Sequence, residues 1–335
     1  MKVLLYTEGE KLFSKSGLGK AIKHQMRALE TQNIEYTTNI KDKDYDILHL
    51  NFYGPKSVLL AKKAHKAGKK VVYHAHTTEK DYRNGFILSE QTASIFRKWL
   101  VKCYSLGDAI VTPTPYSKRL LEEYGIKKKI YAISNGIELD KFKQNKELRK
   151  KFRERYNLKE TDKVVIGVGL YIRRKGIVEF VELAKRLKDY KFIWFGYSPL
   201  IVSTKDVKKA VHTKLDNLVF AGYVEQKMII EAMNGCDVYI FPTYEETEGI
   251  PIIEACACKT KAIVRDIPIF EEWLTDGVNV YKAKNLDEFE EKIKKLIDNK
   301  LPYLGDEAYK VAKERDITKV GQKLKEVYEY VLDVK

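Results

Sequence analysis

The sequence predicts an α/β protein of two domains, each a parallel sheet with helices on both faces. Apolar, β-branched runs such as 3–7, 164–169 and 237–241 are typical of buried parallel strands. Turns rich in Gly or Pro and then helix-prone segments follow them. The chain has 335 residues, too many for one ordinary core and about right for two α/β domains.

The first half of the chain alternates strand-like and helix-like segments. We expect strands at 3–7, 47–50, 71–76 and 108–114. A glycine-rich turn, Ser14–Lys20, opens a helix to about Gln32, and further helices are expected at 56–70, at 89–106 and from Ser117. Residues 79–85 are expected to form a loop.

The second half repeats this pattern after a basic, helix-prone connector at 143–159. Because that connector has no sheet pattern, we place a domain boundary near it. The expected domains are 1–155 and 156–314, followed by a C-terminal helix within 315–335. Strands are expected at 164–169, 192–196, 218–222, 237–241 and 262–264.

Net charge is distributed unevenly between the two halves. Residues 1–155 hold 32 Lys and Arg against 17 Asp and Glu, whereas residues 156–335 hold 30 of each. The whole excess of +15 therefore lies in the first domain. A cationic domain beside a neutral one suggests an anionic partner, either nucleic acid or acidic lipid.

The remaining bulk features point to a protein of the cytosol or the cytosolic membrane face. The longest apolar run, 164–172, is far too short to cross a membrane. Met1 and Lys2 lead directly into a strand, which leaves no room for a signal peptide. The four cysteines lack zinc-ligand spacing and are expected to pack in a reducing compartment.

Two glutamates follow the strand at 237–241. Glu246 falls on the loop after that strand, and Glu254 falls in the first turns of the next helix, after Gly249 and Pro251 break the chain. Ligands of open α/β sheets bind at this edge, where a helix amino end attracts phosphate. Two carboxylates there suit a polyhydroxylated ligand that carries a phosphate, although a solvated acidic loop is the alternative.

This Glu-x7-Glu pattern resembles the paired-glutamate motif of the retaining nucleotide-sugar glycosyltransferases of family 4. The resemblance implies the GT-B fold: two Rossmann-like domains facing a cleft, with the C-terminal helix crossing back to the first domain. It implies that Glu246 holds the donor sugar and Glu254 the ribose. Thr247, Glu248 and Gly249 would border the same donor site.

The same resemblance assigns further donor contacts. Gly17 matches a glycine that packs on the donor pyrophosphate, His76 a histidine that meets the sugar, and Lys175 a pyrophosphate-binding lysine. The family arginine position is Leu170 here, so we expect Arg173 or Arg174 to supply that charge. No metal and no tightly bound cofactor is implied.

Two basic segments of the first domain are candidates for membrane and acceptor binding. One is the lysine face Lys62, Lys63 and Lys66; the other is the helix with Phe96, Lys98, Trp99 and Lys102. An aromatic and cationic helix binds acidic bilayers, and core packing of the aromatics is the alternative.

Several strings, among them Tyr73–Thr77 and Glu245–Gly249, resemble the bacterial glycolipid synthases of this family. The resemblance implies transfer of a hexose from UDP-glucose or UDP-galactose to monoglucosyldiacylglycerol, by a peripheral enzyme on the cytosolic face. A polyprenyl-linked or capsular acceptor is the alternative. Nucleic-acid binding is not expected because no recognised motif is present, and an oxidoreductase is disfavoured because Gly-x-Gly-x-x-Gly is absent after the first strand.

Overall fold

The computed structural model describes residues 1–9, 16–83 and 85–333; Ser14 and Lys15 of the expected glycine-rich turn lie outside these ranges. The chain divides into two compact units. Unit 1 comprises Met1–Tyr82, Gln91–Glu138 and Arg315–Lys335, and unit 2 comprises Arg83–Glu90 and Leu139–Glu314. Each unit contains one six-stranded sheet in which every pairing is parallel.

The sheet of unit 1 has the strand order β2-β1-β3-β4-β5-β6. Its strands are β1 (Lys2–Tyr6), β2 (Glu35–Thr37), β3 (Ile47–Leu50), β4 (Lys70–His74), β5 (Ala109–Thr112) and β6 (Lys129–Ala132). Its helices are α2 (Gly17–Thr31), α3 (Pro55–Lys66), α4 (Glu79–Tyr82), α5 (Ser89–Tyr104), α6 (Pro115–Glu123) and α14 (Ile317–Asp333).

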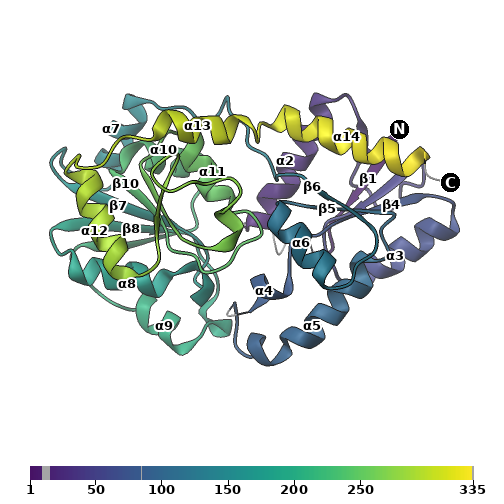
Figure 1. Cartoon of the computed structure of the whole chain (residues 1–335), viewed down its shortest axis with the longest axis horizontal. Helices are drawn as coiled ribbons and strands as arrows, with labels where there is room; N and C mark the ends of the chain where they lie inside the picture. The colour runs from purple at the N-terminus through teal and green to yellow at the C-terminus, as the bar shows by residue number, and fades with distance from the viewer. Residues whose placement is uncertain (10–15, 84, 334–335) are drawn as a thin grey trace. The chain divides into compact units, whose positions relative to one another are not determined.

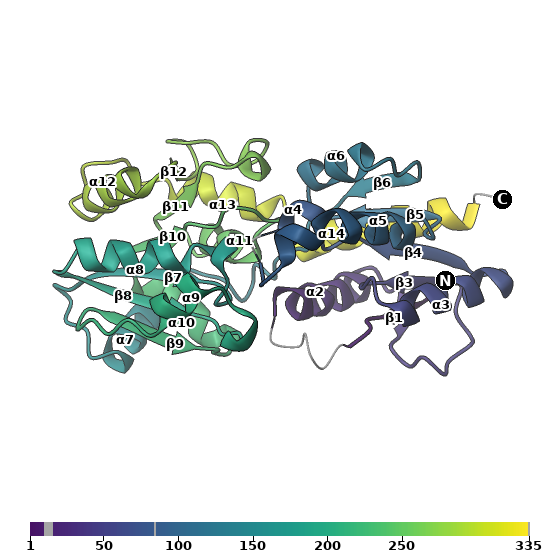
Figure 2. The same cartoon turned by 90° about the horizontal axis from the view of Figure 1, so that it is seen from below.

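Both faces of the central strands β1, β3, β4 and β5 are buried, which explains why these strands are mostly apolar without alternation. Val3 and Leu5 pack with residues of α2 and α14, whereas Leu4, between them, packs with residues of α3 and α5. The C-terminal helix α14 runs beside α2 and contacts β4 (Figure 1, Figure 2).

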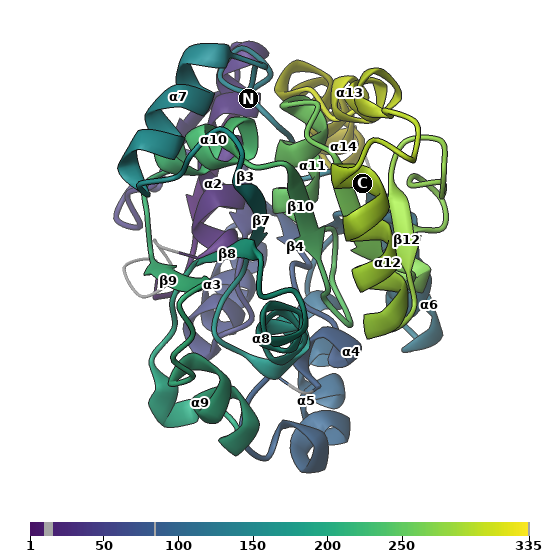
Figure 3. The same cartoon turned by 90° about the vertical axis from the view of Figure 1, so that its left-hand side faces the viewer.

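The sheet of unit 2 has the order β12-β11-β10-β7-β8-β9. Its strands are β7 (Lys163–Val168), β8 (Tyr190–Phe195), β9 (Leu218–Gly222), β10 (Val238–Phe241), β11 (Ala262–Arg265) and β12 (Tyr281–Ala283). Its helices are α7 (Lys146–Arg155), α8 (Ile177–Arg186), α9 (Lys205–Val211), α10 (Gln226–Gly235), α11 (Ile250–Ala257), α12 (Leu286–Ile297) and α13 (Gly305–Lys313). Figure 3 shows α8, α9 and α12 on one face of this sheet and α7, α10, α11 and α13 on the other.

The position of α7 differs from the sequence-based expectation. The sequence places residues up to 155 in the first domain, but α7 belongs to unit 2, and the units divide between Glu138 and Leu139. The reason is packing against α10: Phe152 is buried so closely against Gly235 that a Cβ there would lie 2.1 Å from its ring. Residues 79–82 also form a short helix, α4, rather than a loop.

No helix of the described residues is long and apolar enough to cross a lipid bilayer. All four cysteines are reduced and buried, as packing residues would be.

Candidate active site

The loop after β10 ends abruptly at a glycine that no other residue can replace easily. Gly249 adopts φ +92°, and a Cβ there would lie 3.0 Å from the ring of Phe241. Ile250 then starts α11, and Pro251 is in its first turn, where its fixed φ and missing N–H are tolerated. This local sequence therefore stops the loop and starts the helix, so Glu246 lies on the loop and Glu254 on α11.

A second loop, after β7, packs against the first. It contains a 3₁₀ turn, Arg173–Lys175, that ends at Gly176 with φ +76°. A Cβ on Gly176 would lie 2.3 Å from the carbonyl oxygen of Pro242, so only glycine allows this approach. The Tyr244 N–H donates to the Arg174 carbonyl over 2.8 Å, which fixes the two loops together.

Three polar side chains meet at the Glu246 carboxylate. Lys175 Nζ donates to Oε1, and Arg174 Nη1 lies 3.6 Å from Oε2. Thr243 Oγ1 donates to Oε1 over 3.3 Å. Arg174 Nη1 also donates to the Glu245 carbonyl over 2.5 Å, which orients the guanidinium along the loop. Two cations therefore face one buried carboxylate.

Burial and charge act in opposite directions on Glu246. Burial by itself would raise the pKa of this carboxyl group, but Lys175 and Arg174 outweigh it and hold the pKa below its ordinary value. Glu246 is consequently ionised at neutral pH, able to accept hydrogen bonds from hydroxyl groups but unable to donate one.

The second glutamate of the pair is also buried. Glu254 and Glu248 are 0% and 1% exposed, whereas Thr247 is half-buried. Tyr239, on β10, lies within electrostatic reach of both glutamates: burial raises its pKa strongly, and the negative charges of Glu254 and Glu246 raise it further. Both carboxylates therefore lie close enough to β10 to act on Tyr239.

Arg173 and Arg174, which the sequence leaves as alternatives, have different surroundings. Arg173 donates to Glu179 over 2.8 Å and lies 2.9 Å from Asp206, so its charge is already satisfied away from Glu246. Arg174 is the one that reaches the Glu246 carboxylate. Arg174, and not Arg173, is therefore the arginine next to Glu246.

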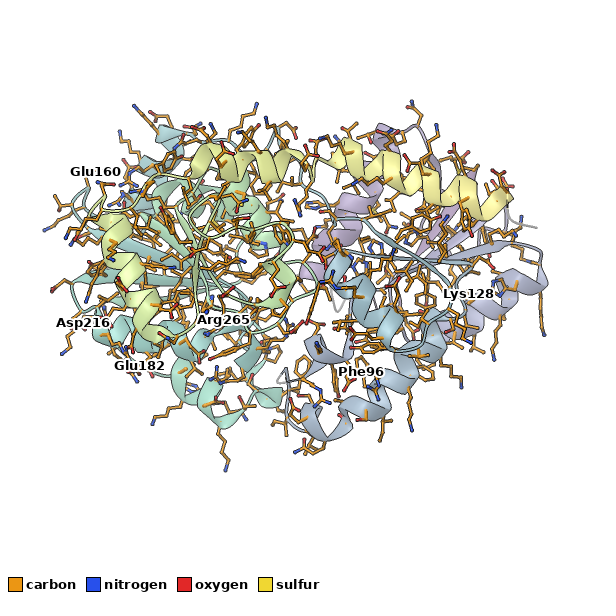
Figure 4. All side chains as sticks on the ribbon, in the orientation of Figure 1. Phe96, Lys128, Glu160, Glu182, Asp216 and Arg265 are labelled. Carbon is orange, nitrogen blue, oxygen red and sulfur yellow. The ribbon has the colours of Figure 1, made fainter. Side chains whose placement is uncertain are left out.

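Sequence reasoning missed the residues that support these loops. Glu179, on α8, accepts a 2.7 Å hydrogen bond from the Tyr244 hydroxyl as well as those of Arg173. Arg265, the last residue of β11 and labelled in Figure 4, lies over the Tyr244 ring: its guanidinium carbon is 3.9 Å from the ring centroid. Arg265 Nε also donates to the Pro242 carbonyl over 3.0 Å. No sequence motif distinguishes either residue from an ordinary surface charge.

His76 and Gly17 belong to unit 1. His76 follows β4, stacks on His74 with ring centroids 3.9 Å apart, and has Nε2 3.0 Å from Asn51 Oδ1. Burial lowers the pKa of His76 to about 3, although a hydrogen bond with Asn135 opposes this, so the ring is neutral. Gly17 is the first residue of α2, and a Cβ there would meet no atom of the described residues within 4 Å.

The residues expected to face a membrane divide into two groups. Lys62, Lys63 and Lys66 are exposed on α3, as are Lys98 and Lys102 on α5. In contrast, Phe96 and Trp99 pack against the core of unit 1. Phe96 (Figure 4) stacks on Tyr82 with ring centroids 4.1 Å apart, and Trp99 Nε1 donates to the Tyr53 carbonyl over 2.8 Å. For these two aromatics the structure favours core packing, the alternative to a lipid-facing role.

Within the described ranges, no group of three or more His, Cys, Asp or Glu side chains is placed to hold a metal ion. The site instead presents cations and buried carboxylates at the carboxyl edge of a parallel sheet. Such a site suits a sugar that carries a phosphate or diphosphate, since carboxylates bind hydroxyls and Lys and Arg bind phosphate.

Comparison with solved structures identifies the fold. Anabaena HepE in complex with UDP-glucose superposes with a TM-score of 0.79, at 18% identity over 98% of this chain and 100% of that one. Sucrose-phosphate synthase from Thermosynechococcus elongatus superposes with a TM-score of 0.78 over the full length of both chains, at 14% identity. Together with the two parallel sheets, these neighbours confirm the expected GT-B fold.

Comparison of sequences then identifies the family. Residues 27–141 match the model of Glycosyltransferase Family 4, and residues 148–315 match that of Glycosyl transferases group 1. The processive diacylglycerol alpha-glucosyltransferase of Acholeplasma laidlawii is 39% identical over the full length of both chains. The alpha-galactosylglucosyldiacylglycerol synthase of Streptococcus pneumoniae is 24% identical over 76% of this chain and 67% of its own. The chain belongs to glycosyltransferase family 4, as the paired glutamates indicated, and is an enzyme that transfers a sugar.

Proposed function

We propose that this enzyme transfers a hexose from UDP-glucose or UDP-galactose to monoglucosyldiacylglycerol and forms an α-linked diglycosyldiacylglycerol. The observation that carries the proposal is the 39% identity over full length with a diacylglycerol alpha-glucosyltransferase. The complex of the structural neighbour HepE with UDP-glucose supports a UDP-sugar as donor.

In this proposal, unit 2 binds the nucleotide sugar. Lys175 and Arg174 bind the diphosphate, because both cations stand at the amino end of α8 and face a loop that starts α11. Glu246 accepts hydrogen bonds from sugar hydroxyls, and Glu254 from the ribose. Thr247, Glu248 and Gly249 border the donor on the same loop.

In the proposed transfer step, negative charge develops on the leaving group of the donor. The bond between the anomeric carbon and the diphosphate oxygen breaks, so negative charge accumulates on the leaving UDP. Lys175 and Arg174 stabilise that charge, which is usually the largest contribution to catalysis. The leaving phosphate takes the proton of the acceptor hydroxyl, which attacks from the same face of the sugar and retains the α configuration. Glu246 and the neutral His76 position the sugar, and Gly17 leaves room for the diphosphate.

A second acceptor has its own support. The relative from Acholeplasma laidlawii is named a processive diacylglycerol glucosyltransferase. That name favours diacylglycerol itself as a first acceptor, with monoglucosyldiacylglycerol as the second. The polyprenyl-linked or capsular acceptor remains the alternative outside this lipid class.

Unit 1 is proposed to bind the acceptor and an anionic membrane from its cytosolic side. The exposed face Lys62, Lys63 and Lys66 supports this, as does the charge of residues 1–138, which hold 24 Lys and Arg against 14 Asp and Glu. Lysines near an acidic lipid surface each contribute about 1 kcal/mol of binding free energy.

Turnover of radiolabelled UDP-glucose and UDP-galactose in mixed micelles tests the proposal. Diacylglycerol and monoglucosyldiacylglycerol would be compared as acceptors, with and without phosphatidylglycerol. We expect transfer to the glucolipid, stimulated by phosphatidylglycerol, and a loss of about 100-fold or more in Glu246→Gln, because a positioned contact to the reacting sugar is removed.

Glu182→Gln is the matched control, since Glu182 lies on α8 of the same unit and its side chain is 40% exposed. Its turnover should equal that of the unchanged enzyme. Slow donor hydrolysis without transfer to either lipid would keep the glycosyltransferase and refute both lipid acceptors.

A further inference from the structure

Five large apolar side chains of unit 2 are exposed on two segments that lie side by side. On the first segment, Phe86, Ile87 and Leu88 are 42%, 53% and 62% exposed. On the second, the 3₁₀ turn Leu200–Val202, Ile201 and Val202 are 81% and 42% exposed. The Ile87 N–H donates to the Val202 carbonyl over 3.2 Å, so the segments form one surface, here named the apolar ridge.

A buried serine follows each segment of the ridge and donates a hydrogen bond to a backbone carbonyl. Ser203 is 1% exposed, and its hydroxyl donates to the Tyr171 carbonyl over 2.9 Å. Ser89 is also 1% exposed, and its N–H donates to the Phe86 carbonyl over 3.2 Å. Leu88 adopts φ +65°, a conformation that is unfavourable for a bulky side chain. The fold therefore keeps small polar residues inside and large apolar ones outside, the reverse of the usual arrangement.

The helix that follows the second ridge segment carries three lysines. Lys205, Lys208 and Lys209 lie on α9, which starts three residues after Val202. No ion pair of these three lysines is found in the described part of the chain, whereas the intervening Asp206 is paired with Arg173. Apolar side chains beside lysines are typical of surfaces that enter the interface of an acidic bilayer.

The size of the ridge favours lipid over a protein partner. Its five side chains expose on the order of 500 Å² of apolar surface, about the size of the largest apolar patch on a typical monomer, which is often functional. A stable protein–protein interface needs about 800 Å² on each partner. Shallow insertion into lipid has no such minimum, because each apolar side chain contributes independently.

We propose that the apolar ridge inserts into the interfacial region of an anionic lipid leaflet, so that the unit carrying Lys175 and Glu246 contacts the membrane itself. This deepens the proposed function and rests on it only for the presence of a lipid acceptor. Phe96 and Trp99, the aromatics expected to insert, are packed in unit 1; the ridge places the inserting residues in the other unit.

An environment-sensitive label tests the proposal. The four native cysteines are buried, so a new surface cysteine takes a thiol-reactive NBD label selectively. We would label Ile201→Cys and Leu88→Cys in the full-length enzyme and add vesicles of phosphatidylcholine with or without phosphatidylglycerol. Val278→Cys is the matched control, because Val278 is 49% exposed in the same unit and distant in sequence from the ridge.

We expect NBD emission at positions 201 and 88 to rise several-fold and shift to the blue with phosphatidylglycerol vesicles, and emission at position 278 to remain unchanged. Ridge labels that stay in a water-like environment while the enzyme sediments with the vesicles would overturn the proposal. An emission increase with protein concentration in the absence of vesicles would also overturn it, in favour of self-association.

A charge-introducing variant provides an independent measurement. Ile201→Glu with Leu88→Glu should weaken partitioning to phosphatidylglycerol vesicles about tenfold or more, since two apolar side chains are replaced by anions. Transfer to an acceptor in detergent micelles should be unchanged. Lipid-sensitive ridge labels in an enzyme that glycosylates no lipid would refute the proposed acceptors and leave the ridge assignment in place. Unaltered partitioning of the double variant would refute the proposal that the apolar ridge inserts into the membrane.

Discussion

The ion pair between Lys175 and Glu246 is the contact on which the candidate site depends, and a double-mutant cycle measures it. The cycle consists of Lys175→Met, Glu246→Gln and the double variant, each unfolded with urea and followed by far-UV circular dichroism and tryptophan fluorescence. The Lys175 and Glu246 side chains are only 14% and 8% exposed, so solvent screens their interaction weakly.

The expected magnitude follows from distance and burial. Two unit charges about 4 Å apart attract by about 4 kcal/mol at the effective dielectric of a protein. Removing one partner of a buried pair costs about 3–5 kcal/mol because the other charge is left buried. Arg174, 3.6 Å from the same carboxylate, retains part of the compensation. We therefore expect Lys175→Met to lower the free energy of unfolding by about 3 kcal/mol, and the cycle to show a coupling of about 2–3 kcal/mol.

The same variant should change the pH dependence of stability. Lys175 and Arg174 hold the pKa of Glu246 below its ordinary value of 4.5, so the ionised pair stabilises the fold above that pH and is lost as pH falls through the lower folded-state value. In Lys175→Met, burial is opposed by one cation fewer, so the pKa of Glu246 rises and the acid-dependent loss begins at a higher pH.

An exposed pair on α8 provides the control. Lys185 and Glu182 lie 3.2 Å apart with side chains 46% and 40% exposed, and their cycle should give about 0–1 kcal/mol. A coupling for Lys175 and Glu246 no larger than this control would refute the buried ion pair, whatever the effect of the single variants on turnover.

Three further outcomes follow from other parts of the structure. Burial lowers the pKa of His49 to about 3 against 6.5 when unfolded, so below pH 6.5 the unfolded chain binds protons that the folded one does not. The free energy of unfolding should fall as pH decreases from 6.5 towards 3, by about 1.4 kcal/mol per pH unit for each such histidine, and equal urea midpoints at pH 7 and pH 5 would contradict this. Gly176→Ala should lower the melting temperature more than Gly68→Ala: both glycines have positive φ, but only at Gly176 would the new Cβ meet backbone, at Pro242. Leu324→Ala, in the buried face of α14, should cost about 2–5 kcal/mol of unfolding free energy and would show no effect if the helix did not pack on unit 1.

Local sequence patterns were sufficient for the fold class and for the carboxyl-edge loop. Strands buried on both faces must be apolar throughout, so β7, β10 and β11 could be located within one or two residues of their observed bounds. Gly249 and Pro251 determine where the loop stops and α11 begins, because their backbone restrictions act within a few residues. The spacing of Glu246 and Glu254 then follows from the chain alone.

Other features depended on contacts between distant segments. Successive residues of a 3₁₀ turn point about 120° apart, so whether Arg173 or Arg174 faces Glu246 is decided by Glu179 and Asp206, which engage Arg173 from other elements. The amphipathic pattern of α5 is the same for a core-packed and a lipid-facing helix, and only the position of Tyr53 and Tyr82 shows that its aromatics are packed.

Most of the strands and helices, the family and the two glutamates could be found in the chain before folding, because hydrophobic periodicity and backbone restrictions are local. The unit to which α7 belongs, the cations that reach Glu246 and the apolar side chains left in solvent could be found only in the folded molecule. Each of these depends on which residues, far apart in the chain, become neighbours when the sheets form.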